Sequence, residues 1–77
     1  MGATAPLNQR TRILLCDDTR DIILLLGAEF ELHPDLEIVG EASNGREVIS
    51  LAEAEQPDVI VLDLAMPEMN DVARVIA

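Results

Sequence analysis

Three aspartates follow two short apolar runs of the sequence, at positions where buried strands would end. Asp17 and Asp18 come directly after the run 13–16, and Asp63 comes directly after the run 59–62. Carboxylates held close together repel one another, and a shared metal ion offsets that repulsion. If the two strands are neighbours, the sequence predicts a metal site built from these three side chains.

The two apolar runs have the length and composition of strands buried on both faces. Residues 12–16 and 59–63 each contain four consecutive apolar residues, which is typical of a parallel sheet in an α/β domain. The carboxyl ends of parallel strands form the ligand site in such sheets. The separation of Asp18 from Asp63 leaves room for two helical crossovers and one more strand.

A first helix is expected between the first two strands. Asp18 or Thr19 serves as its N-cap, and the helix runs to about Leu32, because the residue before Pro34 is pushed out of the helical conformation. Five consecutive apolar residues, 22–26, make this helix apolar almost all round. One face of a sheet cannot cover that much apolar surface.

The remaining pattern predicts a second strand and a second helix. The strand over 36–42 carries charged residues, which suits a position at the rim of the sheet. In the following helix, Asn44 caps the first turn and Glu47 reaches back toward it. This second helix is expected to stop near residues 56–57.

The length of 77 residues allows one domain at most. Residues 1–11 show no hydrophobic period and are expected to form a flexible leader. Residues 12–77 are expected to form the domain, with the order βαβαβ and the start of a third helix at residues 70–71. A domain of this size has little core to spare.

Charge and composition exclude several classes of function. The formal net charge is −10, and an acidic chain repels phosphate backbones and anionic lipid, so we expect no direct binding of nucleic acid or membrane. The longest apolar stretch, 22–28, is too short to span a membrane. Cys16 is the single cysteine and cannot form an internal disulfide. With no signal-peptide pattern, a cytoplasmic location is expected.

The acidic residues and one further motif resemble the receiver domain of two-component response regulators. Asp17 and Asp18 follow the first strand, Asp63 follows the third, and Met-Pro-Glu-Met stands at 66–69. The resemblance covers residues 12–77. It implies a flavodoxin-like (CheY-like) α/β fold, a doubly wound parallel sheet whose three strands here lie in the order 2-1-3.

Two other segments, 33–42 and 44–45, are similar to regulators whose separate output domain is a DNA-binding helix-turn-helix. The resemblance therefore implies a role in transcription regulation within a phosphorelay. The partner would be a histidine kinase or a small phosphodonor.

The resemblance also implies a role for each site residue. Asp63 would accept the phosphoryl group, while Asp17, Asp18, Asp63 and the backbone carbonyl of Ala65 would hold Mg²⁺. The metal would offset the charge of the attacking carboxylate and of the anionic donor. Any catalysis would be limited to self-phosphorylation and dephosphorylation at Asp63.

Two features depart from the receiver pattern. A complete receiver continues through two more strands, one ending in Ser or Thr and one in Lys, and this sequence contains no lysine. We therefore expect a truncated receiver with poor turnover and impaired switching. Residues 70–71 are Asn-Asp, where the family usually has Asp-Gly.

An alternative function remains open at this point. An unpaired edge on the third strand and an apolar first helix predict a homo-oligomer. The chain could then be a non-signalling, self-associating interaction module or folding fragment that retains a vestigial acidic pocket. Asp17 and Asp18 could also serve only as a helix cap.

Other phosphate chemistries fit the residues less well. A phosphatase of the haloacid dehalogenase type needs a second aspartate two positions after its nucleophile, where this chain has Ala65. Flavin and dinucleotide sites place phosphate on a loop rich in glycine or hydroxyl groups, and Asp17 and Asp18 would repel it.

Overall fold

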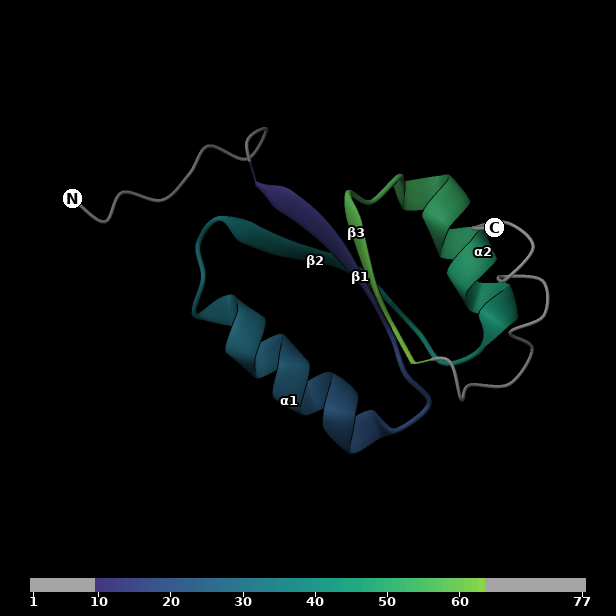
Figure 1. The fold of residues 1–77 in the computed structure, drawn as a ribbon, viewed down its shortest axis with the longest axis horizontal. Coiled ribbons are helices and arrows are strands. Elements are labelled where there is room, and N and C mark those ends of the chain that lie inside the picture. Colours follow the sequence, from purple (N-terminus) through teal and green to yellow (C-terminus); the bar gives the residue numbers. More distant parts are fainter. Residues whose placement is uncertain (1–9, 64–77) are drawn as a thin grey trace.

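The computed structural model describes residues 10–63, which form a parallel three-stranded sheet with one helix on each face (Figure 1). The elements are β1 (Thr11–Cys16), α1 (Arg20–Glu31), β2 (Leu36–Ala42), α2 (Gly45–Glu55) and β3 (Val59–Leu62). The strand order is β2-β1-β3, and both pairings are parallel. This confirms the α/β fold class and the order 2-1-3.

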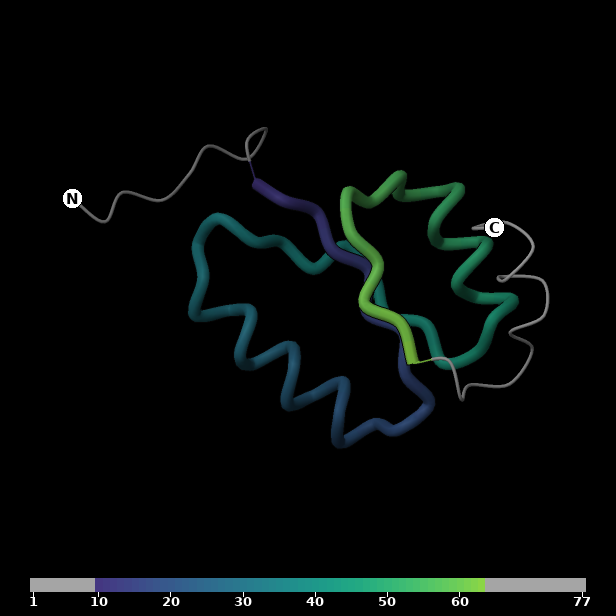
Figure 2. The backbone as a smooth tube through the Cα atoms, in the orientation of Figure 1, coloured from purple at the N-terminus to yellow at the C-terminus, as the bar shows by residue number. Residues whose placement is uncertain are grey.

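The carboxyl ends of the three strands lie together at one edge of the sheet (Figure 2). Their parallel pairing requires this, because β1 is hydrogen-bonded to β2 on one side and to β3 on the other. The turns that lead into α1 and α2 start from the same edge (Figure 2). Residues that follow the strands therefore meet there.

The boundaries differ from the prediction by one residue at two strands. β1 begins at Thr11, not Arg12, because the Thr11 N–H donates to the Asp35 carbonyl at 2.8 Å. The predicted leader 1–11 therefore loses its last residue to the sheet. β3 ends at Leu62, and Asp63 follows it. The predicted third-helix start at residues 70–71 lies outside the described residues.

The side chains of β1 alternate between two small hydrophobic cores. Leu14 and Cys16 pack with Ala42 and Val48 on the α2 side. On the α1 side, the core consists of Ile13, Leu15 and Ile23. A central strand that is apolar on both faces is what the sequence predicted, and burial of these side chains holds both helices to the sheet.

The pairing of β1 with β2 contains a bulge. Ile13 pairs with Ile38, but Leu14 pairs with Gly40, so Val39 is an extra residue in β2. A Cβ atom at Gly40 would lie 3.1 Å from the Leu14 side chain, so the glycine permits this close approach. β2 lies at the rim of the sheet, as predicted.

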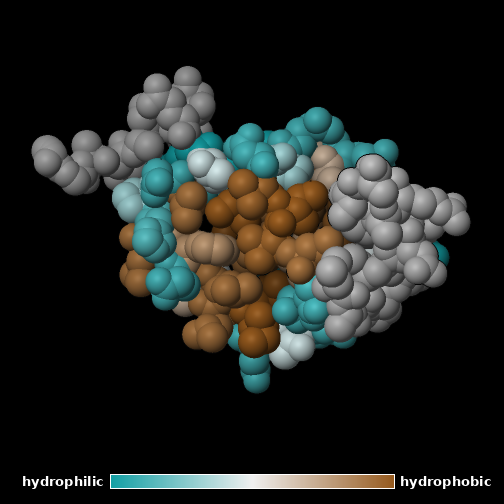
Figure 3. Space-filling model, in the orientation of Figure 1, coloured by the Kyte–Doolittle hydropathy of each residue, from teal (hydrophilic) through white to brown (hydrophobic). Residues whose placement is uncertain are grey.

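Helix α1 covers one face of the sheet and leaves apolar side chains exposed. Thr19 is its N-cap and Leu32 its C-cap, one residue beyond the last helical residue. Of its residues, only Ile23 is buried, whereas Leu24 and Leu25 are 58% and 66% exposed. Figure 3 shows hydrophobic side chains gathered in the middle of the face in view. The surplus of apolar residues in this helix was predicted from the sequence.

Helix α2 begins with the capping arrangement that its sequence predicted. The Glu47 N–H donates to Asn44 Oδ1 at 2.9 Å. The Glu47 carboxylate reaches back to Ser43, one residue before the cap, and accepts from its N–H at 2.7 Å and its hydroxyl at 2.8 Å. The helix ends at Glu55, and Gln56 follows with a left-handed backbone, φ 50°.

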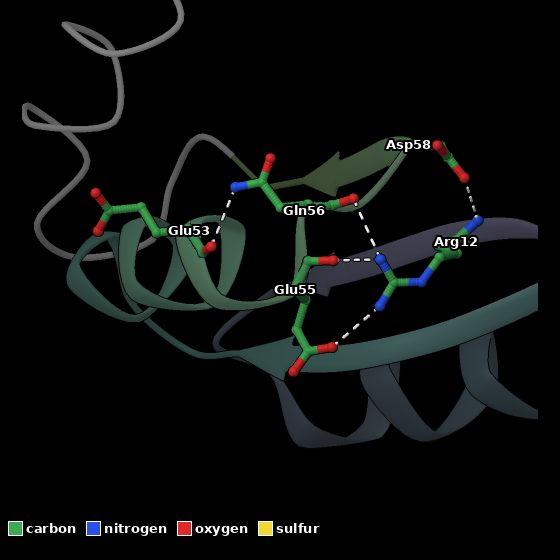
Figure 4. A network of polar contacts seen from close by, with 5 residues as sticks. All are labelled: Arg12, Glu53, Glu55, Gln56 and Asp58. Carbon is green, nitrogen blue, oxygen red and sulfur yellow. Dashed lines mark hydrogen bonds and ion pairs between the residues drawn. The ribbon is translucent and has the colours of Figure 1, made fainter.

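A polar network lies at the start of β1, the end of the sheet opposite to Asp17 and Asp63. Figure 4 shows the residues of this network. The Arg12 guanidinium donates to the carbonyls of Glu55 and Gln56 and forms an ion pair with the Glu55 carboxylate at 3.1 Å. The Arg12 N–H donates to the Asp58 carboxylate at 2.8 Å. Arg12 thereby joins the start of β1 to the segment between α2 and β3.

Within residues 10–63, no helix has both the length and the apolar character needed to cross a membrane.

Candidate metal centre at the carboxyl ends of the strands

The sheet register places Asp17 beside Asp63. Cys16 pairs with Leu62 as the last pair of β1 and β3, so the next residue on each strand is an aspartate. The Asp63 N–H donates to the Cys16 carbonyl at 2.9 Å, and the Asp17 N–H donates to the Ala42 carbonyl at 3.0 Å. Both aspartates are therefore fixed by backbone hydrogen bonds that continue the sheet.

The three predicted carboxylates converge. Asp17, Asp18 and Asp63 can each offer one oxygen such that all of these oxygens lie within 4.8 Å of one another. Asp17 and Asp63 are half-buried, and Asp18 is exposed. The structure thus brings together the three described residues that the sequence singled out. Ala65, the fourth predicted ligand, lies outside the described residues.

The Asp17 side chain is oriented by the turn that leads into α1. Its Oδ1 accepts a hydrogen bond of 2.8 Å from the Thr19 N–H. This is an Asx turn, a common way for aspartate to stabilise the residues before a helix. One carboxylate oxygen of Asp17 thus stabilises the turn, and the carboxylate is held at the end of β1.

The chemistry of these donors suits a hard divalent cation. All three are carboxylates, and oxygen ligands favour Mg²⁺ or Ca²⁺, whereas zinc and copper sites draw on histidine and cysteine. Three negative charges at this separation repel one another, and a divalent cation between them replaces repulsion with attraction. The residues present therefore fit Mg²⁺.

Cys16 stands next to the cluster but does not belong to it. The residue is 2% exposed, and burial raises the pKa of its thiol to about 11. At neutral pH, the thiol is therefore protonated, and a protonated thiol is neither a nucleophile nor a metal ligand. Its interpretation as a core residue agrees with its place beside Leu14.

A cleft of about 300 Å³ opens beside the carboxylates, between the start of α1 and the end of β2. Its polar lining consists of Asp17, Asp18, Arg20, Glu41 and Ser43. Sequence reasoning missed the last three. Arg20 could have been found from its position two residues after the acidic pair, but Glu41 and Ser43 enter only through the pairing of β2 with β1.

Comparison with known proteins gives one consistent family. Residues 13–73 match the response regulator receiver domain. The transcriptional regulatory protein LiaR of Bacillus subtilis is 44% identical over 61 residues, which cover 79% of this chain and 29% of LiaR. A protein-glutamate methylesterase/protein-glutamine glutaminase of Alkalilimnicola ehrlichii is 39% identical over 66 residues, 86% of this chain and 17% of that protein.

Solved structures show the same fold. A structure of the CheA3 P1 domain in complex with CheY6 from R. sphaeroides matches with a TM-score of 0.72 and 28% identity, over 84% of this chain and 51% of that chain. RcsB from Salmonella enterica serovar Typhimurium, bound to promoter rprA, also matches with a TM-score of 0.72, over 75% of this chain and 29% of RcsB. Its identity of 21% supports the fold alone.

The chain spans less than a third of the length of these curated relatives. Fold, sheet order, converging aspartates and the match over residues 13–73 agree. The chain belongs to the response regulator receiver domain family.

Proposed function

We propose that this chain is the phosphoacceptor domain of a two-component response regulator in the cytoplasm. In this proposal, Asp63 takes a phosphoryl group from a histidine kinase or a small phosphodonor in a reaction that depends on Mg²⁺. The observation that carries the proposal is the convergence of Asp17, Asp18 and Asp63, with ligand oxygens within 4.8 Å of one another.

The reaction is an exchange of one bond to phosphorus for another. A carboxylate oxygen of Asp63 attacks phosphorus, and the bond from phosphorus to the donor breaks. The departing histidine nitrogen or acetate oxygen keeps the bonding electron pair, and the product is an acyl phosphate. Water reverses the modification by attacking the same phosphorus, which releases inorganic phosphate and restores the carboxylate.

The metal would be held by Asp17, Asp18 and Asp63, together with the carbonyl of Ala65. When bound, Mg²⁺ supplies positive charge that offsets the charges of the nucleophile and the phosphoryl oxygens. The protein itself positions the nucleophile. Asp63 follows a strand, and its N–H donates to the Cys16 carbonyl. Its backbone therefore loses little conformational entropy when the donor binds.

The proposed partner has support from one structural relative. That structure is a complex of CheY6 with the P1 domain of CheA3, in which a receiver-like chain is bound to another signalling protein. By analogy, the edge that carries Asp63 would face a phosphorylated histidine of a kinase. The family match favours this role over the alternative of a non-signalling interaction module.

Taken by itself, this sequence of 77 residues contains no lysine. It therefore supplies no lysine ammonium group to hold the phosphoryl oxygens, although the family pattern has one. A lost charge-assisted hydrogen bond lowers a rate or an equilibrium by about one to two powers of ten. We accordingly propose slow phosphorylation and impaired switching for this chain on its own.

We also propose that two copies of the chain bind each other. Leu24 and Leu25 on α1 are 58% and 66% exposed, Leu32 at the C-cap of α1 is 73% exposed, and Val59 on β3 is 44% exposed. Burying such side chains between two copies removes apolar area from water. Light scattering at micromolar concentration should give a mass above that of one chain, and a stable monomer would refute the proposal.

The phosphoacceptor role is tested by intact-mass spectrometry after incubation with acetyl phosphate and Mg²⁺. The wild-type chain should gain the mass of one phosphoryl group, and Asp63→Asn should gain none. Asp35→Asn is the matched control, because Asp35 is an exposed aspartate outside the cluster. A phosphoryl group that still appears on Asp63→Asn would overturn the assignment.

A further inference from the structure

Arg20 lies where an anionic phosphodonor would enter. It is the first residue of α1 and lines the 300 Å³ cleft together with Asp17 and Asp18. Glu41 lines the same cleft. Its lining thus has three negative charges and one positive charge, with Asp63 adjoining. An incoming phosphate group is repelled by all of the carboxylates.

The other described arginines occupy different places. Arg12 is bound to Glu55 at the opposite end of the sheet. Arg10 lines a different cleft, and Arg46 is exposed on α2 outside the cleft beside the carboxylates. Within residues 10–63, Arg20 is therefore the one arginine that lines the cleft beside Asp17 and Asp18.

The Arg20 guanidinium is also available for a ligand. Among the described residues, none forms a hydrogen bond or an ion pair with the Arg20 side chain. Arg12, by contrast, uses its guanidinium for three contacts that hold two segments together. A charged side chain beside three carboxylates that pairs with none of them is poorly explained by a structural role.

We propose that Arg20 binds the phosphoryl oxygens of the incoming phosphodonor and so determines how readily the site accepts small phosphodonors. This inference rests on the proposed function of Asp63. A guanidinium presents a rigid fork of N–H donors that matches a phosphate group and can bind two of its oxygens at once. The N-terminus of α1 adds the positive end of the helix dipole at the same place.

Arg20 forms no covalent bond in this scheme. It stays protonated and donates hydrogen bonds while the phosphorus–oxygen bond of acetyl phosphate breaks and the bond to Asp63 forms. Acetate leaves with the electron pair of the broken bond. Arg20 partly offsets the carboxylate charge of the cleft.

The test compares Arg20→Ala, Arg20→Lys and a control, Arg46→Ala. The control removes the same charge from an exposed residue that is also in the first turn of a helix, but Arg46 does not line the cleft. The second-order rate constant for phosphorylation by acetyl phosphate should fall about tenfold in Arg20→Ala. The rate constant of Arg20→Lys should lie between that of Arg20→Ala and that of the wild type. The rate constant of Arg46→Ala should stay within about twofold of the wild-type value.

Mg²⁺ affinity separates this role from damage to the metal site. Removing a cation beside three carboxylates should leave the Mg²⁺ dissociation constant of Arg20→Ala unchanged or lower. Weaker Mg²⁺ binding in Arg20→Ala would overturn the proposal, because Arg20 would then support the metal ligands. Equal rate losses in Arg20→Ala and Arg46→Ala would also overturn it, since net charge alone would explain both.

A second probe distinguishes failure of this inference from failure of the proposed function. Inorganic phosphate is titrated into the Mg²⁺-loaded chain, and binding is followed by the NMR signals of the Arg20 guanidinium and the α1 amides. If the wild type gains no phosphoryl group yet binds phosphate more tightly than Arg20→Ala, the Asp63 role fails and the Arg20 site stands. If the wild type binds no phosphate, the Arg20 site is refuted.

Discussion

Asp18 is the most exposed of the three clustered carboxylates, and this makes it the most informative one to change. Asp18→Asn removes one charge from a group of like charges, so without metal we expect the free energy of unfolding to rise by less than about 1 kcal/mol. With Mg²⁺ present, the metal-induced rise in melting temperature should shrink, because a ligand is lost.

Thermal unfolding with and without Mg²⁺ measures both effects of Asp18→Asn. Asp35→Asn removes the same charge from an exposed aspartate outside the cluster and should leave the Mg²⁺-induced rise intact. An identical response of the two variants to Mg²⁺ would mean that the ion binds the acidic surface at large.

Cys16 gives a second prediction at the level of a single residue. Burial raises the pKa of its thiol from 9.0 to about 11, so the folded chain has about a hundredfold less thiolate than the unfolded chain at neutral pH. Alkylation by iodoacetamide should therefore be slow in the native state and fast in denaturant. Rapid labelling of the native chain would show that this strand end is open to solvent.

The same pKa shift predicts how stability responds to alkaline pH. The unfolded thiol loses its proton near its ordinary pKa, while the folded thiol keeps its proton up to about 11. Stability is therefore full below the ordinary value and falls as pH rises toward the folded value. Chemical denaturation across this range should show the decline, and Cys16→Ala should reduce it.

The acidic cluster could be predicted from sequence because parallel strands bring their carboxyl ends together. The two apolar runs and their order were enough to predict that Asp17 and Asp63 lie together. Arg20 and Glu41 were missed for a physical reason. A cleft depends on how a helix and a neighbouring strand diverge, and residue type and spacing do not specify that.

At the scale of elements, the start of α2 depends on reciprocal hydrogen bonds. The Ser43 backbone N–H and then its hydroxyl lower the pKa of Glu47 by donating to the carboxylate. This contribution to stability is present above the ordinary glutamate pKa and is lost as pH falls through the lower, folded value. Glu47→Gln should therefore be less stable than the wild type at neutral pH and nearly equal to it in acid.

Asn44→Ala should lower the free energy of unfolding by about 1 kcal/mol, because the Glu47 N–H loses its side-chain acceptor. Urea denaturation at neutral pH measures the change. Ser50→Ala, an exposed substitution later in the same helix, is the control and should have little effect. A loss no larger than that of the control would show that the cap contributes nothing.

Arg12 connects β1 with the segment between α2 and β3 (Figure 4). Its side chain is 35% exposed, so solvent weakens the ion pair, and we expect Arg12→Ala to cost about 1 kcal/mol of stability. Arg12→Lys retains the charge but not the forked set of N–H donors, so its stability should lie between those of Arg12→Ala and the wild type. Since Arg12 lies at the opposite end of the sheet, Mg²⁺ affinity should not change, and a weaker affinity would contradict this separation.

The elements were predictable to the extent that local pattern decides them. The Asn44 cap and the strand over 36–42 follow from residue type and alternation, and both were found. The bulge at Val39 was not, because it arises from the pairing of two strands. The Arg12 network was also missed, because it joins residues that only the fold brings together.

At the scale of the whole molecule, the dominant feature is charge. A chain of net charge −10 gathers three carboxylates at one sheet edge, and its stability should rise when a divalent cation binds the folded form alone. The two thin cores on either side of β1 leave exposed apolar surface on α1. The proposed metal binding and the proposed self-association would thus be separate sources of stability, and each could be varied without the other.

The most direct measurement is a calorimetric titration of Mg²⁺ into the wild-type chain and into Asp17→Asn and Asp63→Asn, with Asp35→Asn as control. We predict one Mg²⁺ ion per chain, with affinity at least about tenfold weaker in the two cluster variants and unchanged in the control. Several weak and equivalent ions, or one ion bound equally well by all four proteins, would contradict the convergence of these carboxylates on a single metal.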